Sequence, residues 1–181
     1  MVERTHSLKE QLKANIHAIV KTAGFERLIP EVGSNFVGCL LGTTKLKEVA
    51  GLTGRIILDR GRPVAIGDVD FGWAPFMGQV LLKAHSLNKQ ILSAISVRNT
   101  PDIVDASRHA NLQVVGYRLP ENKPPPDCMT LMALNKLGFV PEVLFDWGAH
   151  GLEPLVIVFG SSPREVRVRV QKIIGELLAS E

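Results

Sequence analysis

Stretches with helical periodicity alternate with short apolar runs along most of the chain, and this alternation constrains the fold more than any other feature. Apolar residues recur at helical spacing from Ser7 onward, from about Ala74 to Asn88, and after Ser162. Between these stretches lie apolar runs short enough for strands, such as FVGCLLG, EVLFD and PLVIVFG. The pattern predicts helices packed against a sheet.

Two further features predict that this sheet is mixed. The segment GRIILDRGRPVAIG has apolar arms around Asp59, Arg60 and Gly61, which predicts a β-hairpin with an irregular turn. The last two apolar runs lie close together, which also argues against a purely parallel sheet. We therefore predict a three-layer α/β/α sandwich with a mixed, partly antiparallel sheet, and a single domain over residues 1–181.

Two local patterns predict where elements begin and stop. Ser7 and Glu10 form a capping box, which predicts that the first helix begins there. The segment PENKPPPD, residues 120–127, contains four prolines and predicts a stiff, exposed connector.

Charge and composition argue against several functions. The 21 Lys and Arg residues are spread along the chain, whereas a nucleic-acid-binding face concentrates them, so we expect no direct nucleic-acid contact. No apolar stretch is long enough for a membrane span, and the charged N-terminal residues do not resemble a secretion signal. Cys39 and Cys128 lack metal-ligand spacing, which fits free thiols in the reducing cytoplasm.

The first of three glycine-containing loops that can bind a ligand precedes the run FVGCLLG. It places Glu31, Gly33, Ser34 and Asn35 together, and such a turn can direct backbone N–H groups and the serine hydroxyl at a phosphate. The alternative is an ordinary connection in which Gly and Asn adopt positive φ.

The second loop contains two carboxylates, Asp68 and Asp70, followed by Phe71 and Gly72. Carboxylates two residues apart can share a Mg²⁺ ion that carries a diphosphate substrate. In the alternative, they point to opposite sides of an extended segment and one of them caps the next helix.

The third loop lies between two buried strands and holds Asp146, Gly148, Gly151 and Glu153. Because both ends are anchored in the sheet, this loop is a candidate for a binding function. It also carries His150, either an acid or base or a solvated surface residue.

Arg55 and Arg98 are the candidates for neutralising a phosphate, since a guanidinium group matches phosphate oxygens; surface ion pairs are the alternative. No Walker-type, GxGxxG, GxSxG or HExxH motif occurs in the chain. We therefore expect a phosphorylated small molecule as ligand and no metal site built by the protein alone.

Taken together, these loops resemble a known family. The segments LIPEVGSNFV, GRI, DVDFG, VRNTPDI and PEVLFDWGAHGLEP, in this order, resemble the ThiN-type thiamine-phosphate synthase domain over nearly the whole chain. The resemblance implies a fold like that of class II aldolases. It also implies a reaction that joins hydroxymethylpyrimidine diphosphate to thiazole phosphate and releases pyrophosphate.

The resemblance assigns roles to individual residues. It implies that Arg55 is catalytic and that Arg98 lies beside the site. Two positions depart from the family pattern: Phe76 stands where the family carries a catalytic histidine, and Leu152 stands where it commonly carries a lysine. Either His85 or His150 could replace the missing histidine.

Two alternative functions follow from these departures and from the fold. Members of the family fused to DNA-binding segments act as thiamine-phosphate sensors, which makes a sensor the main alternative to an enzyme. An aldolase-like metal enzyme is the weaker alternative, because the chain has no HxH ligand pair. The sequence leaves open whether the chain forms a homodimer.

Overall fold

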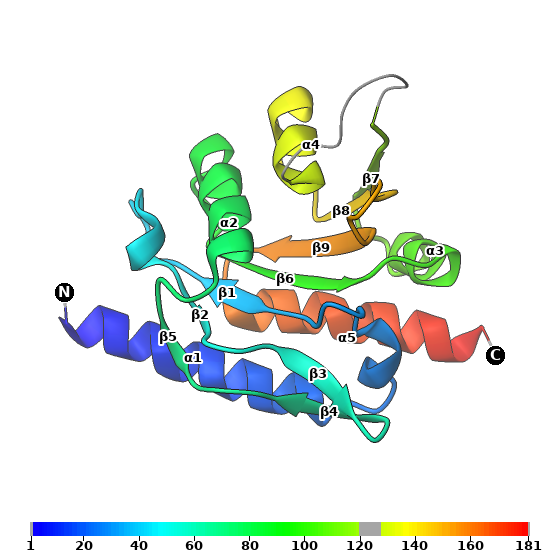
Figure 1. The fold of residues 1–181 in the computed structure, drawn as a ribbon, viewed down its shortest axis with the longest axis horizontal. Helices are drawn as coiled ribbons and strands as arrows, with labels where there is room; N and C mark the ends of the chain where they lie inside the picture. The colour runs from blue at the N-terminus through cyan, green and yellow to red at the C-terminus, as the bar shows by residue number, and fades with distance from the viewer. Residues whose placement is uncertain (1, 120–127, 181) are drawn as a thin grey trace.

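The computed structural model describes residues 2–119 and 128–180, and within them a seven-stranded sheet lies between two layers of helices (Figure 1). The helices are α1 (Val2–Val20), η1 (Phe25–Leu28), η2 (Leu46–Glu48), α2 (Pro75–Leu87), α3 (Pro101–His109), α4 (Met129–Leu137) and α5 (Pro163–Ala179). The strands are β1 (Phe36–Gly38), β2 (Ala50–Leu52), β3 (Ile56–Asp59), β4 (Arg62–Ala65), β5 (Val69–Phe71), β6 (Ser93–Arg98), β7 (Val114–Tyr117), β8 (Val143–Asp146) and β9 (Leu155–Gly160). The predicted connector, residues 120–127, lies outside the described residues.

The large sheet has the strand order β5-β2-β1-β6-β9-β8-β7. Only β7 and β8 run parallel among the strand pairs of the described residues; the other neighbours are antiparallel. The prediction of a mixed sheet is confirmed. β2 and β5 were not predicted, because Gly51 and Asp70 interrupt them and neither forms an apolar run.

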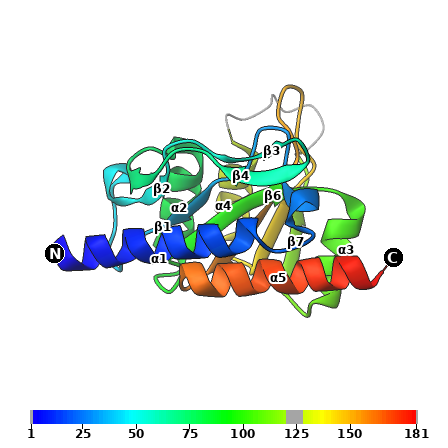
Figure 2. The ribbon, with the colours of Figure 1, turned by 90° about the horizontal axis from the view of Figure 1, so that it is seen from below.

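Each face of the sheet packs against its own helices. α1, α3 and α5 cover one face, where α1 and α5 lie side by side (Figure 2). α2 and α4 cover the other face. Side chains alternate between the two cores along β9: Val156 and Val158 contact the first core, whereas Ile157 and Phe159 contact the second. These three layers confirm the predicted sandwich.

The predicted hairpin forms from β3 and β4, but it makes a separate two-stranded sheet. Its turn residues Arg60 and Gly61 have φ of 49° and 78°, as a two-residue turn of the type favoured in hairpins requires. A bridge between Ser34 and Ile56 ties the hairpin to the loop before β1. The hairpin therefore holds Arg55, the residue just before β3, beside that loop.

The predicted start of the first helix is wrong. α1 begins at Val2, and Ser7 lies inside it, where its hydroxyl accepts a hydrogen bond from Gln11 Nε2 at 3.2 Å. The residues before Ser7 include neither Gly nor Pro, so nothing ends the helix there. Ser7 and Glu10 are thus interior residues of this helix, and each pairs with another residue of it, Ser7 with Gln11 and Glu10 with Lys13.

Candidate active site

One end of the large sheet carries a pocket formed by two of the three predicted loops. β1 and β9 begin at this end, and β6 and β8 finish there, as the pairings Phe36 with Ile95 and Arg98 with Leu155 show. The pocket has a volume of about 250 Å³. Its lining residues are Val32, Gly33, Arg55, Phe76, Ser96, Cys128, Met129, Thr130, Asp146, Gly151, Leu152, Glu153 and Leu155.

Arg55 lines the pocket beside Gly33, in agreement with the predicted convergence of a guanidinium group and a glycine turn. Gly33 has a φ of 77°, and a Cβ added there would lie 3.1 Å from Arg55 Cβ and 3.2 Å from Arg55 Cδ. Glycine is needed here both for the backbone conformation and for this close approach. The first loop therefore positions the arginine stem.

Glu153 links the first loop to the third. Its Oε1 accepts a hydrogen bond from the Glu31 N–H at 2.8 Å, and its Oε2 accepts one from the Val32 N–H at 2.9 Å. Both carboxylate oxygens are thus engaged by the backbone of the turn that ends at Gly33. This geometry indicates that Glu153 and Glu31 shape the pocket through the turn.

Asp146, the last residue of β8, is 3% exposed and lines the pocket. Its Oδ1 accepts the Gly148 N–H at 2.8 Å, and its Oδ2 lies 3.4 Å from the Thr130 hydroxyl. Burial raises the pKa of this carboxyl, although the Gly148 and Leu155 N–H groups and Thr130 oppose the shift.

The glycines of the third loop permit its tight return. Ala149 and Leu152 exchange two backbone hydrogen bonds, and Gly148 and Gly151 have φ of 65° and 77°. A Cβ on Gly148 would lie 2.5 Å from the Leu152 carbonyl oxygen. Gly151 lines the pocket, whereas Gly148 acts by donating its N–H to Asp146.

The start of α4 supplies lining residues that the sequence analysis missed. Cys128, Met129 and Thr130 line the pocket, together with Ser96 of β6. Cys128 Sγ accepts the Leu131 N–H at 3.4 Å and so caps the helix. Burial raises the pKa of the Cys128 thiol, which favours its protonated form. No motif marks these residues in the sequence, because their place in the pocket depends on the tertiary packing of α4.

Both departures from the family pattern lie in the pocket. Phe76, at the start of α2, and Leu152, in the third loop, are lining residues. The N-termini of α2 and α4, where the helix dipoles are positive, therefore both border the pocket. The N-cap residue of α2, Ala74, provides no side-chain hydrogen bond to the free N–H groups there. The pocket wall is apolar at the two positions where the resemblance implies polar groups.

Asn35 and Ser34, predicted ligand residues, are buried and do not line the pocket. Asn35 Oδ1 accepts the Leu52 N–H at 3.2 Å, and its Nδ2 donates to the carbonyl oxygens of Leu52 and Gly54. Ser34 pairs with Ile56 through its backbone, and its hydroxyl has no partner among the described residues. Asn35 thus bonds the backbone that leads from β2 toward Arg55.

We expect Asn35→Ala to lower the free energy of unfolding by about 2–4 kcal/mol, because it leaves backbone groups of Leu52 and Gly54 without partners. Urea denaturation followed by circular dichroism measures the change. Asn135→Ala, at an exposed position on α4, is the control and should stay within about 0.5 kcal/mol of wild type. Equal losses in the two variants would contradict this role for Asn35.

The second predicted loop does not join the pocket. Lys9 Nζ lies 3.0 Å from Asp70 Oδ1, and Lys13 Nζ lies 2.9 Å from Asp68 Oδ1. Each lysine lowers the pKa of its carboxyl partner. The alternative that the two carboxylates point to opposite sides is wrong, because both pair with lysines of α1. Phe71 packs against the core beneath α1, and the Gly72 N–H bonds the Val49 carbonyl oxygen.

Arg98 borders the pocket without lining it. It ends β6 on the face shared by Ser96, and it pairs with Leu155, itself a lining residue. Its binding role stays a prediction.

Neither of the two histidines considered as replacements lines the pocket. His85 is fully buried, with Nδ1 2.9 Å from the Ile91 carbonyl oxygen and Nε2 3.3 Å from the Gly42 nitrogen. Since the Gly42 N–H donates to Nε2, the ring proton lies on Nδ1. His150 is exposed on the third loop.

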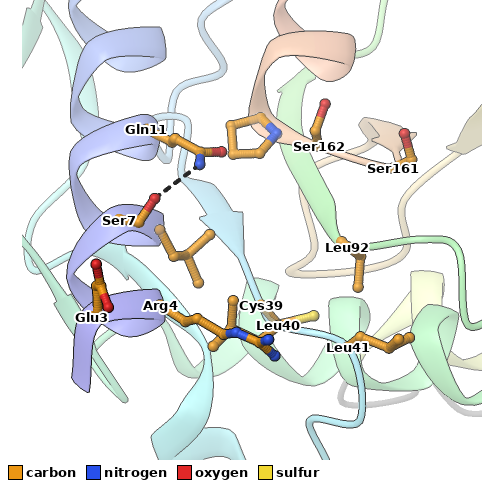
Figure 3. Close-up of a pocket in the computed structure, with 12 residues that line it drawn as sticks. Glu3, Arg4, Ser7, Gln11, Cys39, Leu40, Leu41, Leu92, Ser161 and Ser162 are labelled. Carbon is orange, nitrogen blue, oxygen red and sulfur yellow. Dashed lines mark hydrogen bonds between the residues drawn. The ribbon is translucent and has the colours of Figure 1, made fainter. Parts of the chain in front are cut away.

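A larger groove, of about 550 Å³, lies between the start of α1, the residues after β1 and the start of α5 (Figure 3). None of the predicted site residues lines it. Its serines are already engaged: Ser7 by Gln11, and Ser161 and Ser162 by Glu165. We therefore place the candidate site in the smaller pocket.

Residues 2–119 and 128–180 present no cluster of three or more His, Cys, Asp or Glu side chains able to hold a metal ion. In the same residues, no helix combines the length and apolar character needed to cross a bilayer.

The chain is similar to known proteins in sequence and in fold. A family model described as thiamine-phosphate synthase ThiN matches residues 11–172. The bifunctional thiamine biosynthesis protein ThiDN of Methanocaldococcus jannaschii is 32% identical over an alignment of 158 residues, which covers 83% of this chain and 38% of that protein. The thiamine-phosphate synthase ThiN of Methanothermobacter thermautotrophicus is 25% identical over 91% of both chains. The present chain thus corresponds to little more than a third of the bifunctional relative.

Solved structures extend the comparison. The C-terminal domain of protein MJ0236 superimposes with a TM-score of 0.86 at 29% identity, covering 97% of this chain and 98% of that one. An aldolase II superfamily protein from Pseudomonas syringae has a TM-score of 0.58 at 12% identity, covering 96% and 75%. The second match concerns the fold alone, and it agrees with the expected aldolase-like architecture. Given the family match over most of its length, the chain belongs to the ThiN family of thiamine-phosphate synthase domains.

Proposed function

We propose that the pocket beside Arg55 binds hydroxymethylpyrimidine diphosphate and thiazole phosphate and joins them into thiamine phosphate. The observation that carries the proposal is the convergence of Arg55, Gly33, Gly151 and Glu153 on one pocket in a ThiN chain. These residues come from segments far apart in the sequence, so their meeting is a property of the fold.

The reaction asks for a specific kind of site. The thiazole nitrogen attacks the methylene carbon of the pyrimidine, while the bond from that carbon to the diphosphate oxygen breaks. Pyrophosphate leaves with the bonding electrons, and the thiazole becomes a thiazolium. Negative charge therefore grows on the leaving group, and cations and fixed N–H donors stabilise it. Arg55 and the start of α2 supply these groups.

Mg²⁺ is proposed to accompany the diphosphate, bound mainly by phosphate oxygens. The described residues do not fit a protein-built magnesium site: Asp68 and Asp70 pair with lysines of α1, and both Glu153 oxygens accept backbone N–H groups. We therefore assign no step of the reaction to a metal held by this chain.

The apolar side chains of Phe76 and Leu152 are proposed to slow the reaction more than they weaken binding. Phenylalanine provides no proton donor and leucine provides no cation for the leaving pyrophosphate. A missing donor or cation mainly weakens the stabilisation of the charge that grows on the leaving pyrophosphate in the transition state, whereas Arg55 can still bind the ligand in its ground state.

The purified protein tests the proposal directly when it is given both precursors with Mg²⁺ and assayed for pyrophosphate. Release above the background without protein, together with thiamine phosphate as product, is the expected result. Absence of release with tight binding of thiamine phosphate in calorimetry would end the synthase proposal and favour the sensor. Absence of both would remove thiamine compounds from consideration.

A further inference from the structure

Asp146 is a buried carboxylate without a cationic partner. It is 3% exposed, and the described residues form no ion pair with it. Its hydrogen bonds come from neutral donors, of which Gly148 is well placed at 2.8 Å and Thr130 is distant at 3.4 Å. A buried carboxylate is costly unless donors satisfy its oxygens, and it can accept about four hydrogen bonds. Oδ2 therefore retains acceptor capacity in a residue that lines the pocket.

The strand order separates Asp146 from Arg55, the residue proposed to bind phosphate. Arg55 packs on Gly33 before β1, whereas Asp146 ends β8, and β6 and β9 lie between these two strands. At the usual spacing of neighbouring strands, β1 and β8 lie about 14 Å apart. The carboxylate of Asp146 would repel an anion beside it. The anionic part of a ligand therefore fits near Arg55, and a part that carries N–H donors fits near Asp146. Apolar side chains of Phe76, Met129 and Leu155 also line the pocket and suit ring faces.

We propose that Asp146 selects the amino-substituted pyrimidine by accepting a hydrogen bond from its exocyclic amino group. This inference rests on the proposed function and adds a specificity-determining residue to it. The carboxylate favours a ring with an N–H donor at this position and rejects the analogue with an oxygen there, because the two oxygens repel each other. Asp146 acts in substrate recognition alone and takes no part in making or breaking covalent bonds.

Calorimetry with two ligands tests the inference: thiamine phosphate and oxythiamine phosphate, in which an oxo group replaces the amino group. The wild-type protein is expected to bind thiamine phosphate about 10- to 100-fold more tightly, since the contact is a hydrogen bond to a charged acceptor. In Asp146→Asn the ratio should fall to about one or reverse, because the carboxamide can donate to the oxo group.

Asp146→Asn has nearly the same shape and removes a buried charge, so its Tm should not fall below that of wild type. Asp59→Asn, at the exposed hairpin tip, is the matched control and should keep the wild-type ratio. If Asp146→Asn does not fold, Asp146→Ser is measured in the same way.

The outcomes separate the inference from the proposed function. Tight binding of thiamine phosphate with a ratio near one in the wild type would overturn the inference and leave the proposed function intact. An unchanged ratio in the folded Asp146 variant would do the same. If neither compound binds the wild type, both the inference and the proposed function are overturned.

Discussion

Arg55→Ala is expected to lower kcat/KM for pyrophosphate release by about 100- to 1,000-fold, the cost of removing one group aimed at developing charge. The side chain lines the pocket and packs on Gly33, which has no side chain to replace it. The substitution should leave the hairpin strands unchanged, because Arg55 precedes β3 and the role proposed for its side chain is electrostatic. Steady-state assays with both precursors measure the effect.

Two variants make the Arg55 result specific. Arg55→Lys keeps a positive charge but loses the planar fork, so it should fall between wild type and Arg55→Ala. Arg62→Ala removes an exposed arginine from the same hairpin, outside the pocket, and should behave like wild type. Similar losses for Arg55→Ala and Arg62→Ala would show that general positive charge, not the pocket, is responsible.

Phe76→His is expected to raise kcat by about 100-fold or more, the lower range for a positioned acid or base. Phe76 lines the pocket at the start of α2, and the family resemblance implies a histidine at this position. On the proposed function, a histidine here would line the substrate pocket, and the half-buried site leaves room for the smaller ring. Thiamine-phosphate affinity should change much less than kcat, since the gain concerns the transition state.

Phe139→His is the matched control, because Phe139 is 43% exposed and does not line the pocket. Its kcat should equal that of wild type. If Phe76→His and Phe139→His have the same kcat, the missing histidine does not limit the reaction and Phe76 does not mark the reacting centre.

The architecture could be predicted from the sequence because it depends on local patterns. Periodicity located the central helices and strands, and the Arg60–Gly61 pair predicted the hairpin turn. The glycine turn at Gly33 and the loop from Asp146 to Glu153 were recognised for the same reason. A turn that needs positive φ or a short polar side chain is specified by a few neighbouring residues, so it can be recognised in the sequence.

The remaining site features depend on contacts between distant segments. The carboxylates of Glu153 and Asp70 looked alike in sequence, yet the first engages the Glu31 and Val32 backbone while the second pairs with Lys9. The hydroxyl of Thr130 reaches Asp146 only because α4 packs beside β8. Which partner each polar group finds is decided by tertiary structure, and sequence spacing carries no information about it.

A crystal structure of the protein with thiamine phosphate tests the central claim most directly. We predict the phosphate against Arg55 near Gly33 and the aminopyrimidine ring near Asp146, within the pocket that Glu153 lines. Thiamine phosphate bound instead in the groove between α1 and α5, or bound with no contact to Arg55, would contradict it.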